Sequence, residues 1–283
     1  MRSILRQGLK RFVANKTERP RGDKSATVIA VSARKGGVGK TTTCVNLAAA
    51  LGRFEGKRVL VIDLDPQNHV GTSLASQVQA GGRGISAVFD EGTDVNVIDI
   101  VTPTDAENLH VVPPDSGLDR VEAVLTSRIG KEFVLREQLE IARTYYDLIL
   151  LDCPPNIGNL TLNALVAADL VLVPCDLSPL AVDGVHALVE TIATVSERLN
   201  PRIDVLGILI TRFDARNVGM NETVLAELEG AYGDVVIPTR IGINTDLAKA
   251  QLAGKNVYDF APKSRGAAHY QELAEFVVSQ LES

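Results

Sequence analysis

A glycine-rich segment near the start of the chain limits what this sequence can fold into more than any other feature. The run KGGVGKTT, from Lys35 to Thr42, lies between a predicted strand and a predicted helix. Its glycines let the backbone approach a phosphate closely, and the helix N-terminus adds a favourable dipole. Lys40 can reach the β- and γ-phosphates of a nucleotide, and the Thr41 hydroxyl can ligate Mg²⁺. We therefore predict a P-loop that binds ATP with Mg²⁺, against the alternative of a glycine-rich loop without a ligand.

The predicted nucleotide contacts follow from this motif, and they are Gly36, Gly37, Val38, Gly39, Lys40, Thr41 and Thr42. From Thr27 onward, short β-branched runs alternate with amphipathic helical patterns. The predicted strands are 27–32, 58–63, 109–112, 147–152, 169–174, 205–211 and 235–237. The predicted helices are 41–54, 118–126, 131–143, 159–167, 183–199, 217–230, 244–253 and 267–281. Apolar strands separated by helices are typical of a parallel sheet covered on both faces, so we predict one α/β P-loop NTPase domain over residues 26–283, with a mostly parallel twisted sheet.

Residues 1–25 are predicted to be a basic N-terminal extension. Residues 1–24 carry eight Lys or Arg against two acids, a charge of +6, which leaves −12 on the rest of a chain whose net charge is −6. Ile4, Leu5, Leu9, Phe12 and Val13 recur at helical spacing, and residues 15–25 resemble a linker. The segment is either a frayed tail or an amphipathic helix that binds a membrane, DNA or a protein partner.

Composition excludes some classes of protein. No apolar run approaches the ~20 residues that cross a bilayer, and no apolar stretch follows the basic N-terminus as a signal peptide requires. Cys44, Cys153 and Cys175 lie far apart and form no metal-binding pattern. We expect a cytoplasmic protein with reduced, structural thiols.

Two acidic motifs follow predicted strands. The sequence DLDPQ begins at Asp63 and includes Asp65, and DCPP begins at Asp152. Carboxylates at the C-terminal ends of parallel strands beside a P-loop can hold Mg²⁺ or orient water. Asp152 fits a Walker B carboxylate, and the two prolines after it stiffen the turn. The alternatives are a surface turn for the first motif and a helix cap for Asp152.

These motifs together resemble the ParA/MinD superfamily over about residues 27–280. Arg34 stands where the common P-loop pattern has its first glycine, and a second lysine, Lys35, opens the loop, as in the deviant Walker A box of that superfamily. DLDPQ and DCPP resemble the corresponding ParA boxes. DLDPQ and the acidic C-terminus favour the ParA branch over MinD, in the short form without an N-terminal domain that reads DNA.

The resemblance implies roles for single residues. Lys35 would cross a dimer interface to the phosphates of the partner's ATP, so that Lys35, Lys40 and Asp65 are the catalytic candidates. Asp65 would lie near the attacking water and the metal, and the metal candidates are Thr41, Asp65 and Asp152. The backbone near Arg212 and Pro238 would line the adenine pocket, so these residues and Asp152 complete the expected nucleotide site.

The function implied is an ATPase that acts as a positioning switch. Two ATP-bound copies would form a homodimer that binds nonspecific DNA of the nucleoid, and a ParB-like or other activating partner would stimulate slow hydrolysis. The cargo would be a plasmid, a chromosome origin or a protein assembly. The candidate DNA contacts are Arg216, Arg240, Lys249, Lys255 and Lys263.

Two rival functions remain at this stage. The first is a MinD-like scaffold that binds a membrane surface through residues 1–24, since each basic residue there contributes about 1 kcal/mol near anionic lipid. The second is a P-loop metabolic enzyme. The chain also departs from the ParA pattern at residues 176–180 and 239–246, where a partner or DNA would dock.

Overall fold

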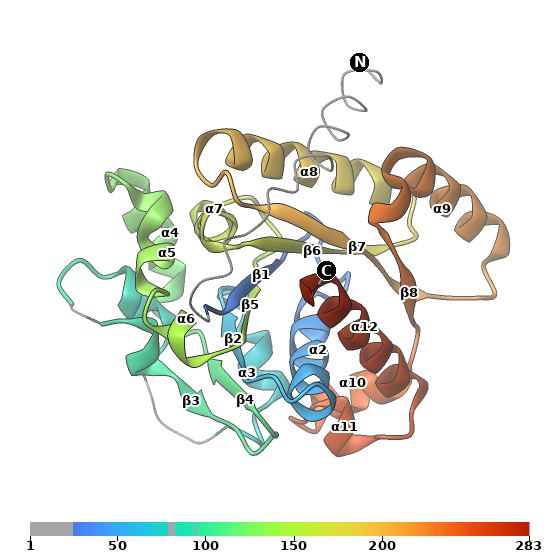
Figure 1. Cartoon of the computed structure of the whole chain (residues 1–283), viewed down its shortest axis with the longest axis horizontal. Helices are drawn as coiled ribbons and strands as arrows, with labels where there is room; N and C mark the ends of the chain where they lie inside the picture. Colours follow the sequence, from blue (N-terminus) through green and yellow to red (C-terminus); the bar gives the residue numbers. More distant parts are fainter. Residues whose placement is uncertain (1–24, 79–82, 94, 283) are drawn as a thin grey trace.

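Eight strands form one twisted sheet, and its order places the glycine-rich loop near the centre (Figure 1). The computed structural model describes residues 25–78, 83–93 and 95–282. The sheet order is β3-β4-β2-β5-β1-β6-β7-β8, and every pair is parallel except the antiparallel pair β3–β4. The strands are β1 (Thr27–Val31), β2 (Val59–Asp63), β3 (Thr102–Pro103), β4 (Leu109–Val112), β5 (Leu148–Asp152), β6 (Leu170–Asp176), β7 (Asp204–Phe213) and β8 (Val236–Gly242).

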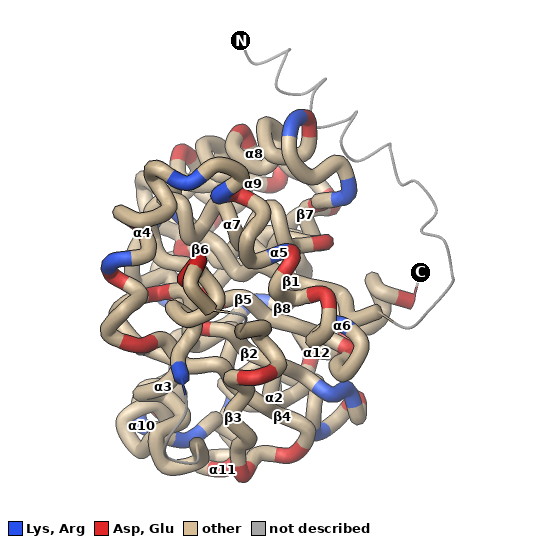
Figure 2. Tube along the Cα trace, turned by 90° about the vertical axis from the view of Figure 1, so that its left-hand side faces the viewer, with Lys and Arg blue, Asp and Glu red and all other residues tan. Residues whose placement is uncertain are grey.

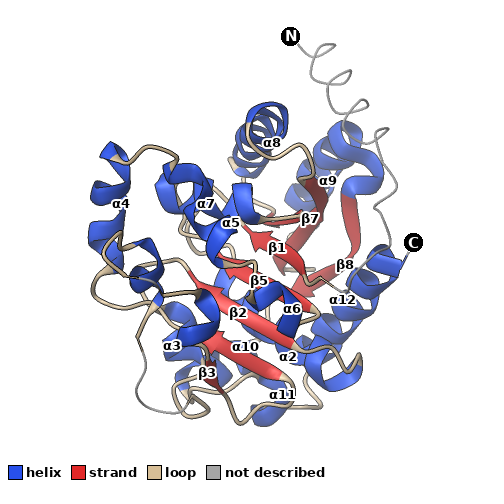
Figure 3. Ribbon diagram, turned by 60° about the vertical axis from the view of Figure 1, so that its left-hand side comes forward, coloured by secondary structure: helices blue, strands red, loops and turns tan. Residues whose placement is uncertain are grey.

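Helices cover both faces of this sheet (Figure 3). Those of the described residues are α2 (Lys40–Phe54), α3 (His69–Ser73), α4 (Leu118–Ser127), α5 (Val134–Gln138), α6 (Ala142–Tyr145), α7 (Asn159–Ala167), α8 (Ala181–Arg198), α9 (Val218–Tyr232), α10 (Thr245–Leu252), α11 (Val257–Phe260) and α12 (Arg265–Glu282). Helices α4, α5, α7, α8 and α9 pack on one face, and α2, α11 and α12 pack on the other. The predicted α/β fold with a mostly parallel sheet is confirmed.

The strands divide their side chains between two cores. In β1, Val28 and Ala30 join the core beneath α7 and α8, whereas Ile29 and Val31 join the core beneath α2 and α12. Successive side chains of a strand point to opposite faces, so a strand with a helix layer on each side needs apolar residues at every position. This is the physical reason that the strands read as continuous apolar runs.

Register aligns the ends of three neighbouring strands. Val31 of β1 lies opposite Asp152 of β5, and Asp152 lies opposite Asp63 of β2. The loop after β1 enters α2, so the loop and both carboxylates meet at the C-terminal edge of the sheet. Ligands of parallel α/β sheets bind at this edge.

Two predicted elements differ from the structure in extent or number, and three short elements are additional to the prediction. The helix predicted over 131–143 is a 3₁₀ turn followed by α5 and α6, because the Glu140 N–H bonds the Glu137 carbonyl at three-residue spacing. Strand β8 continues past Pro238 to Gly242. Proline has no backbone N–H to donate, and an edge strand tolerates it because no outer neighbour needs a donor there. The short elements β3, α3 and α11 had no clear sequence pattern and were not predicted.

Residues 1–24 of the predicted basic N-terminal extension lie outside the described residues, so the alternatives of a frayed tail and an amphipathic helix both stay open. Within the part of the chain that the structure describes, no helix combines the length and the apolar character needed to cross a membrane.

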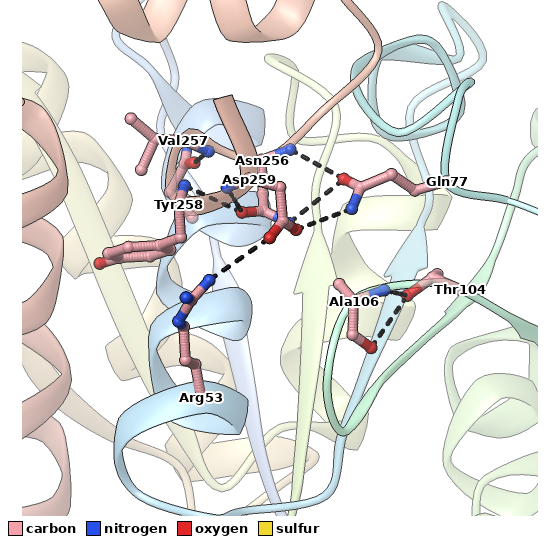
Figure 4. Close-up of polar contacts among 9 residues, drawn as sticks. Arg53, Gln77, Thr104, Ala106, Asn256, Val257, Tyr258 and Asp259 are labelled. Atoms are coloured by element: carbon pink, nitrogen blue, oxygen red, sulfur yellow. Dashed lines mark hydrogen bonds and ion pairs between the residues drawn. The ribbon is translucent and has the colours of Figure 1, made fainter. Parts of the chain in front are cut away.

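A polar network fastens the helix that follows the glycine-rich loop to α11 (Figure 4). The Asp259 carboxylate accepts hydrogen bonds from Gln77 at 2.8 Å and from Arg53 of α2 at 3.3 Å. Gln77 in turn accepts from the Asn256 backbone at 2.9 Å, and the Val257 N–H donates to Asn46 of α2 at 2.8 Å. Since Asn256 is buried, these bonds satisfy polar groups that would otherwise be costly.

Helix α7, which follows the DCPP motif, is capped from a distance. Its N-cap position is Gly158, which has no side chain to cap the helix. The Glu122 carboxylate of α4 accepts instead from the backbone N–H groups of Asn159 at 2.8 Å and Leu160 at 3.0 Å. A Cβ on Gly158 would lie 2.4 Å from Glu122 Oε1, so the glycine makes room for this cap.

We expect Glu122→Ala to lower the free energy of unfolding by about 1–2 kcal/mol, because two N–H groups lose their acceptor and the helix dipole loses its counter-charge. Urea denaturation followed by circular dichroism measures the change. Glu140→Ala is the matched control, since Glu140 is exposed, and it should change stability by less than about 0.5 kcal/mol. Equal effects of the two substitutions would contradict the cap.

Candidate functional site

The loop between β1 and α2 has the backbone conformation of a phosphate cradle. Gly37 and Gly39 have φ angles of 75° and 88°, which side-chain-bearing residues adopt rarely. Gly36 has nothing within 4 Å of a Cβ position, so space is open above the loop. Helix α2 starts at Lys40, and its first N–H groups therefore face the loop. Lys40 itself is only 7% exposed.

Strand β7 holds the second half of this loop in place. The Thr211 hydroxyl donates to the Val38 carbonyl at 2.7 Å, and Arg212 Nη1 donates to the Gly37 carbonyl at 3.0 Å. Arg212 has a φ of 51°, in the left-handed region that costs a non-glycine residue about 1 kcal/mol or more. A loop held from its neighbour strand keeps its N–H groups oriented before any ligand arrives.

Thr41 and Asp152 meet beneath the loop. The Thr41 hydroxyl donates to Asp152 Oδ2 at 2.6 Å. The other oxygen, Asp152 Oδ1, is buried without a hydrogen-bond partner among the described residues. Burial raises the pKa of Asp152 to about 7, although the hydrogen bond from Thr41 and the charge of Lys40 oppose that rise. A buried carboxylate with one free oxygen is ready to accept a cation.

Asp63, beside Asp152, orients the next loop. Its Oδ1 accepts from the Asp65 N–H at 2.9 Å, and its Oδ2 accepts from the Val70 N–H at 2.9 Å, at the start of α3. Burial and the neighbouring Asp152 raise the pKa of Asp63, and those two N–H donors oppose the rise. Asp63 thus closes the DLDPQ turn and fixes the position of Asp65.

Asp65 lies within this turn and is 6% exposed. Its Oδ1 accepts from the Gln67 N–H at 3.0 Å, and its charge helps to raise the pKa of Asp152. The structure therefore places Asp65 close to the Thr41–Asp152 pair, as the predicted catalytic and metal roles require. Those roles remain predictions.

The donor set suits Mg²⁺. Mg²⁺ prefers oxygen ligands and is usually held by one or two carboxylates or hydroxyls together with phosphates and water. Thr41 Oγ1 and Asp152 Oδ1 are such oxygens, and the second has no other partner. No group of three or more His, Cys, Asp or Glu in the described ranges forms a metal site by itself. Thr41 and Asp152 would hold the ion, with Asp65 beside them.

Lys35, at the entrance of the loop, is engaged within its own subunit. Its Nζ lies 2.7 Å from Asp176 at the end of β6, the strand next to β1. The other predicted nucleotide contacts, from Gly36 to Thr42, lie together along the loop and the start of α2.

The predicted adenine contacts lie apart from each other. Arg212 touches the loop through its side chain, as described above. Pro238 lies exposed within the edge strand β8, which β6 and β7 separate from β1. The structure thus brings Arg212 to the phosphate loop, whereas Pro238 lies on β8, beyond β6 and β7.

The candidate DNA contacts do not form one patch of free cations. Figure 2 shows Lys and Arg positions scattered and interleaved with acids over one side of the molecule. Three of the five candidates pair with acids: Arg216 with Asp214 at 2.7 Å, Arg240 with Glu229 at 3.9 Å, and Lys249 with Asp246 at 3.3 Å. Within the described residues, no ion pair involves Lys255 or Lys263. These two are the better candidates on this ground.

The fold and this site define a P-loop ATPase with a second lysine at the loop entrance. A family model described as an AAA domain matches residues 26–205. The sporulation initiation inhibitor protein Soj of Bacillus subtilis is 38% identical over 253 residues, covering 89% of this chain and 98% of Soj. The chromosome-partitioning ATPase Soj of Thermus thermophilus is 41% identical, covering 90% of this chain and 96% of that protein.

A solved structure of a related protein has the same fold. The crystal structure of cobyrinic acid a,c-diamide synthase from Mycobacterium smegmatis, with bound ATP analogue and magnesium, superposes with a TM-score of 0.77 at 33% identity, covering 91% of this chain and 96% of that chain. The chain belongs to the ParA/MinD family of P-loop ATPases.

Three side chains that shape the site, those of Asp63, Asp176 and Thr211, had no assigned role in the sequence-based prediction. Asp63 was noted only as part of DLDPQ, although a buried strand ending in Asp is a sequence signal for such a role. Asp176 was noted only as a departure from the family pattern. The Thr211 hydroxyl bond to Val38 spans 173 residues in sequence and has no local signal.

The raised pKa of Asp152 predicts a pH dependence of stability without nucleotide and Mg²⁺. Its folded pKa of about 7 exceeds the ordinary value of 3.8, so its contribution is complete below about pH 4 and is lost as pH rises through 7. Residue 152 cannot titrate in Asp152→Asn. We therefore expect the unfolding free energy of Asp152→Asn, minus that of wild type, to increase by at least about 1 kcal/mol from pH 5 to pH 8. Urea denaturation in EDTA measures this, and parallel pH profiles for the two proteins would contradict it.

Proposed function

We propose that this protein is an ATP-dimerised switch that binds nonspecific DNA and hydrolyses ATP slowly to position a cargo. The observation that carries the proposal is the pairing of a complete phosphate and Mg²⁺ site with a second lysine, Lys35, on the exposed entrance of the loop. A cation at that place can reach a nucleotide bound by another copy, as an arginine finger does.

The chemistry follows from the positions of the side chains. Backbone N–H groups of the loop and Lys40 would bind the phosphates, and Thr41 with Asp152 would hold Mg²⁺, which would supply positive charge to the phosphate oxygens. Asp65, fixed by Asp63, orients the attacking water. The loop is held by β7 before the nucleotide binds, so little reorganisation accompanies binding.

A second copy would cover the C-terminal edge of the sheet. Exposed apolar side chains follow the ends of three strands that flank or lie near β1: Ile157 after β5, Leu180 after β6, and Val218 and Met220 after β7. Exposed apolar groups around a charged site favour a protein interface. The same edge carries Lys35, so pairing through it would bring each Lys35 to the other subunit's nucleotide.

Nonspecific DNA binding would use cations from both copies. Phosphate contacts add with number, so a dimer doubles a weak monomer site. Relatives named for chromosome partitioning support such a role, and a ParB-like activator belongs to the same proposal. The cytoplasm and its nucleoid would be the place of action. The rival membrane scaffold rests on residues 1–24, which lie outside the described residues.

We expect Asp65→Ala to retain ATP binding and ATP-dependent dimerisation but to lower hydrolysis at least about 100-fold, because the water loses its orienting carboxylate. Single-turnover hydrolysis and light scattering measure the two properties. Asp105→Ala, an aspartate in the turn between β3 and β4, is the control and should hydrolyse ATP normally. Unchanged hydrolysis in Asp65→Ala would remove Asp65 from the mechanism.

Binding to a nonspecific DNA duplex tests the function directly. We expect affinity only with ATP·Mg²⁺, falling steeply with salt and lost in Lys35→Ala. Lys255→Ala and Lys263→Ala should each lower the slope of log K against log salt by about 2, because each substitution removes one phosphate contact from each copy of the dimer. Lys57→Ala is the matched control, since Lys57 pairs with Glu282 at the opposite end of the sheet. If ATP produces dimers without DNA affinity, the nucleoid role is wrong, and binding to anionic vesicles with and without residues 1–24 is the next test.

A further inference from the structure

All three donors of the Lys35 ammonium are used within its own subunit. Its Nζ lies 2.7 Å from Asp176 Oδ2, 3.1 Å from Asp176 Oδ1 and 3.0 Å from the Ser178 hydroxyl. Ser178 also donates to Asp176 Oδ1 at 2.8 Å. The three side chains form a closed ring of hydrogen bonds, in which an ammonium has no donor left for another anion.

This ring has a defined place in the fold. Asp176 is the last residue of β6, and Ser178 lies in the turn that leads into α8. The side chains of Lys35 and Asp176 are 46% and 20% exposed, so the pair is partly shielded from water. Asp176 and Ser178 lie within residues 176–180, where the chain departs from the ParA pattern.

The ring also completes the fastening of the loop. Asp176 pairs in register with Thr211 of β7, and Thr211 holds the second half of the loop through Val38. On the β6 side, the Ser32 N–H bonds the Leu172 carbonyl, and Lys35 adds a side-chain contact to Asp176. Releasing Lys35 would free the loop entrance and leave the phosphate cradle fastened.

We propose that Asp176 and Ser178 form an intrachain latch, which holds Lys35 away from the nucleotide of a second copy of this chain. The inference rests on the proposed ATP dimer and adds its regulation. Lys35 must leave Asp176 before it can bind the partner's phosphates. The apparent affinity between copies is therefore reduced in proportion to the fraction of Lys35 that is free. Both latches must open in a symmetric dimer, so the effects of the two protomers multiply.

The latch also separates ATP from ADP. One carboxylate and one hydroxyl compete with whatever anion the partner presents. A triphosphate offers more charge and more acceptor oxygens than a diphosphate, and charge-assisted bonds to it are stronger. The latch thereby raises the interaction energy that the partner's nucleotide must supply to Lys35, and ATP supplies enough whereas ADP does not.

Asp176→Asn in the full-length chain tests the latch. With a non-hydrolysable ATP analogue and Mg²⁺, we expect the dimer dissociation constant from sedimentation to fall about threefold per protomer and so about tenfold overall. Ser178→Ala should shift it in the same direction by less. Binding of a fluorescent ATP analogue to dilute monomer should not change. Asp147→Asn removes a comparable pair with Arg58 at the opposite edge of the sheet and should leave dimerisation unchanged.

A second readout follows Lys35 itself. In nucleotide-free protein, acetylation of Lys35 by an amine-reactive ester, measured by mass spectrometry, should be several times faster in Asp176→Asn than in wild type. If wild type dimerises with the analogue and Lys35→Ala does not, but Asp176→Asn leaves dimerisation and acetylation unchanged, the latch alone is wrong. If wild type does not dimerise at all, the proposed function fails and the latch with it.

Discussion

The parallel register of β1, β2 and β5 is the constraint on which the rest of the site depends. It sets Asp63 and Asp152 side by side below the loop that leaves β1. Two buried carboxylates at such proximity repel each other, and burial raises the pKa of both. The fold tolerates them because Asp63 accepts two backbone N–H groups and Asp152 accepts the Thr41 hydroxyl. The remaining acceptor, Asp152 Oδ1, is where a cation would remove the electrostatic penalty.

The glycine-rich loop is fastened unevenly, and this links binding to assembly. Strand β7 holds its second half through two bonds to backbone carbonyls, which keep the phosphate-binding N–H groups in place. Strand β6 holds its first half through a backbone bond from the Ser32 N–H to the Leu172 carbonyl and through the side chain of Lys35, which bonds Asp176. A backbone contact can persist through the ATP cycle, whereas a side-chain contact can exchange one anion for another. The loop can therefore bind nucleotide in a fixed shape while Lys35 changes partners.

Helix positions depend on contacts between residues far apart in sequence. Glu122 caps α7 across 37 residues, and Asp259 joins α11 to α2 across 206 residues. The helix pattern over 131–143 predicted one helix. In the structure Asn163 of α7 accepts the Leu135 N–H at the start of α5, and the Glu140 N–H bonds the Glu137 carbonyl at its end, so a 3₁₀ turn and two short helices form instead. Local propensity could not show this, because the competing acceptor comes from another helix.

Local sequence patterns were enough to predict the alternation of strands and helices, the phosphate loop and the acidic residues that end strands. These are local patterns, since glycine conformation, apolar periodicity and strand length are set by neighbours along the chain. The tertiary structure alone decided which acid meets Thr41, that Asp63 orients Asp65, and that Lys35 lies on Asp176. Residues that are 141 positions apart, as Lys35 and Asp176 are, come together only through sheet order. Strand order is fixed by packing in two cores, and no local pattern records it.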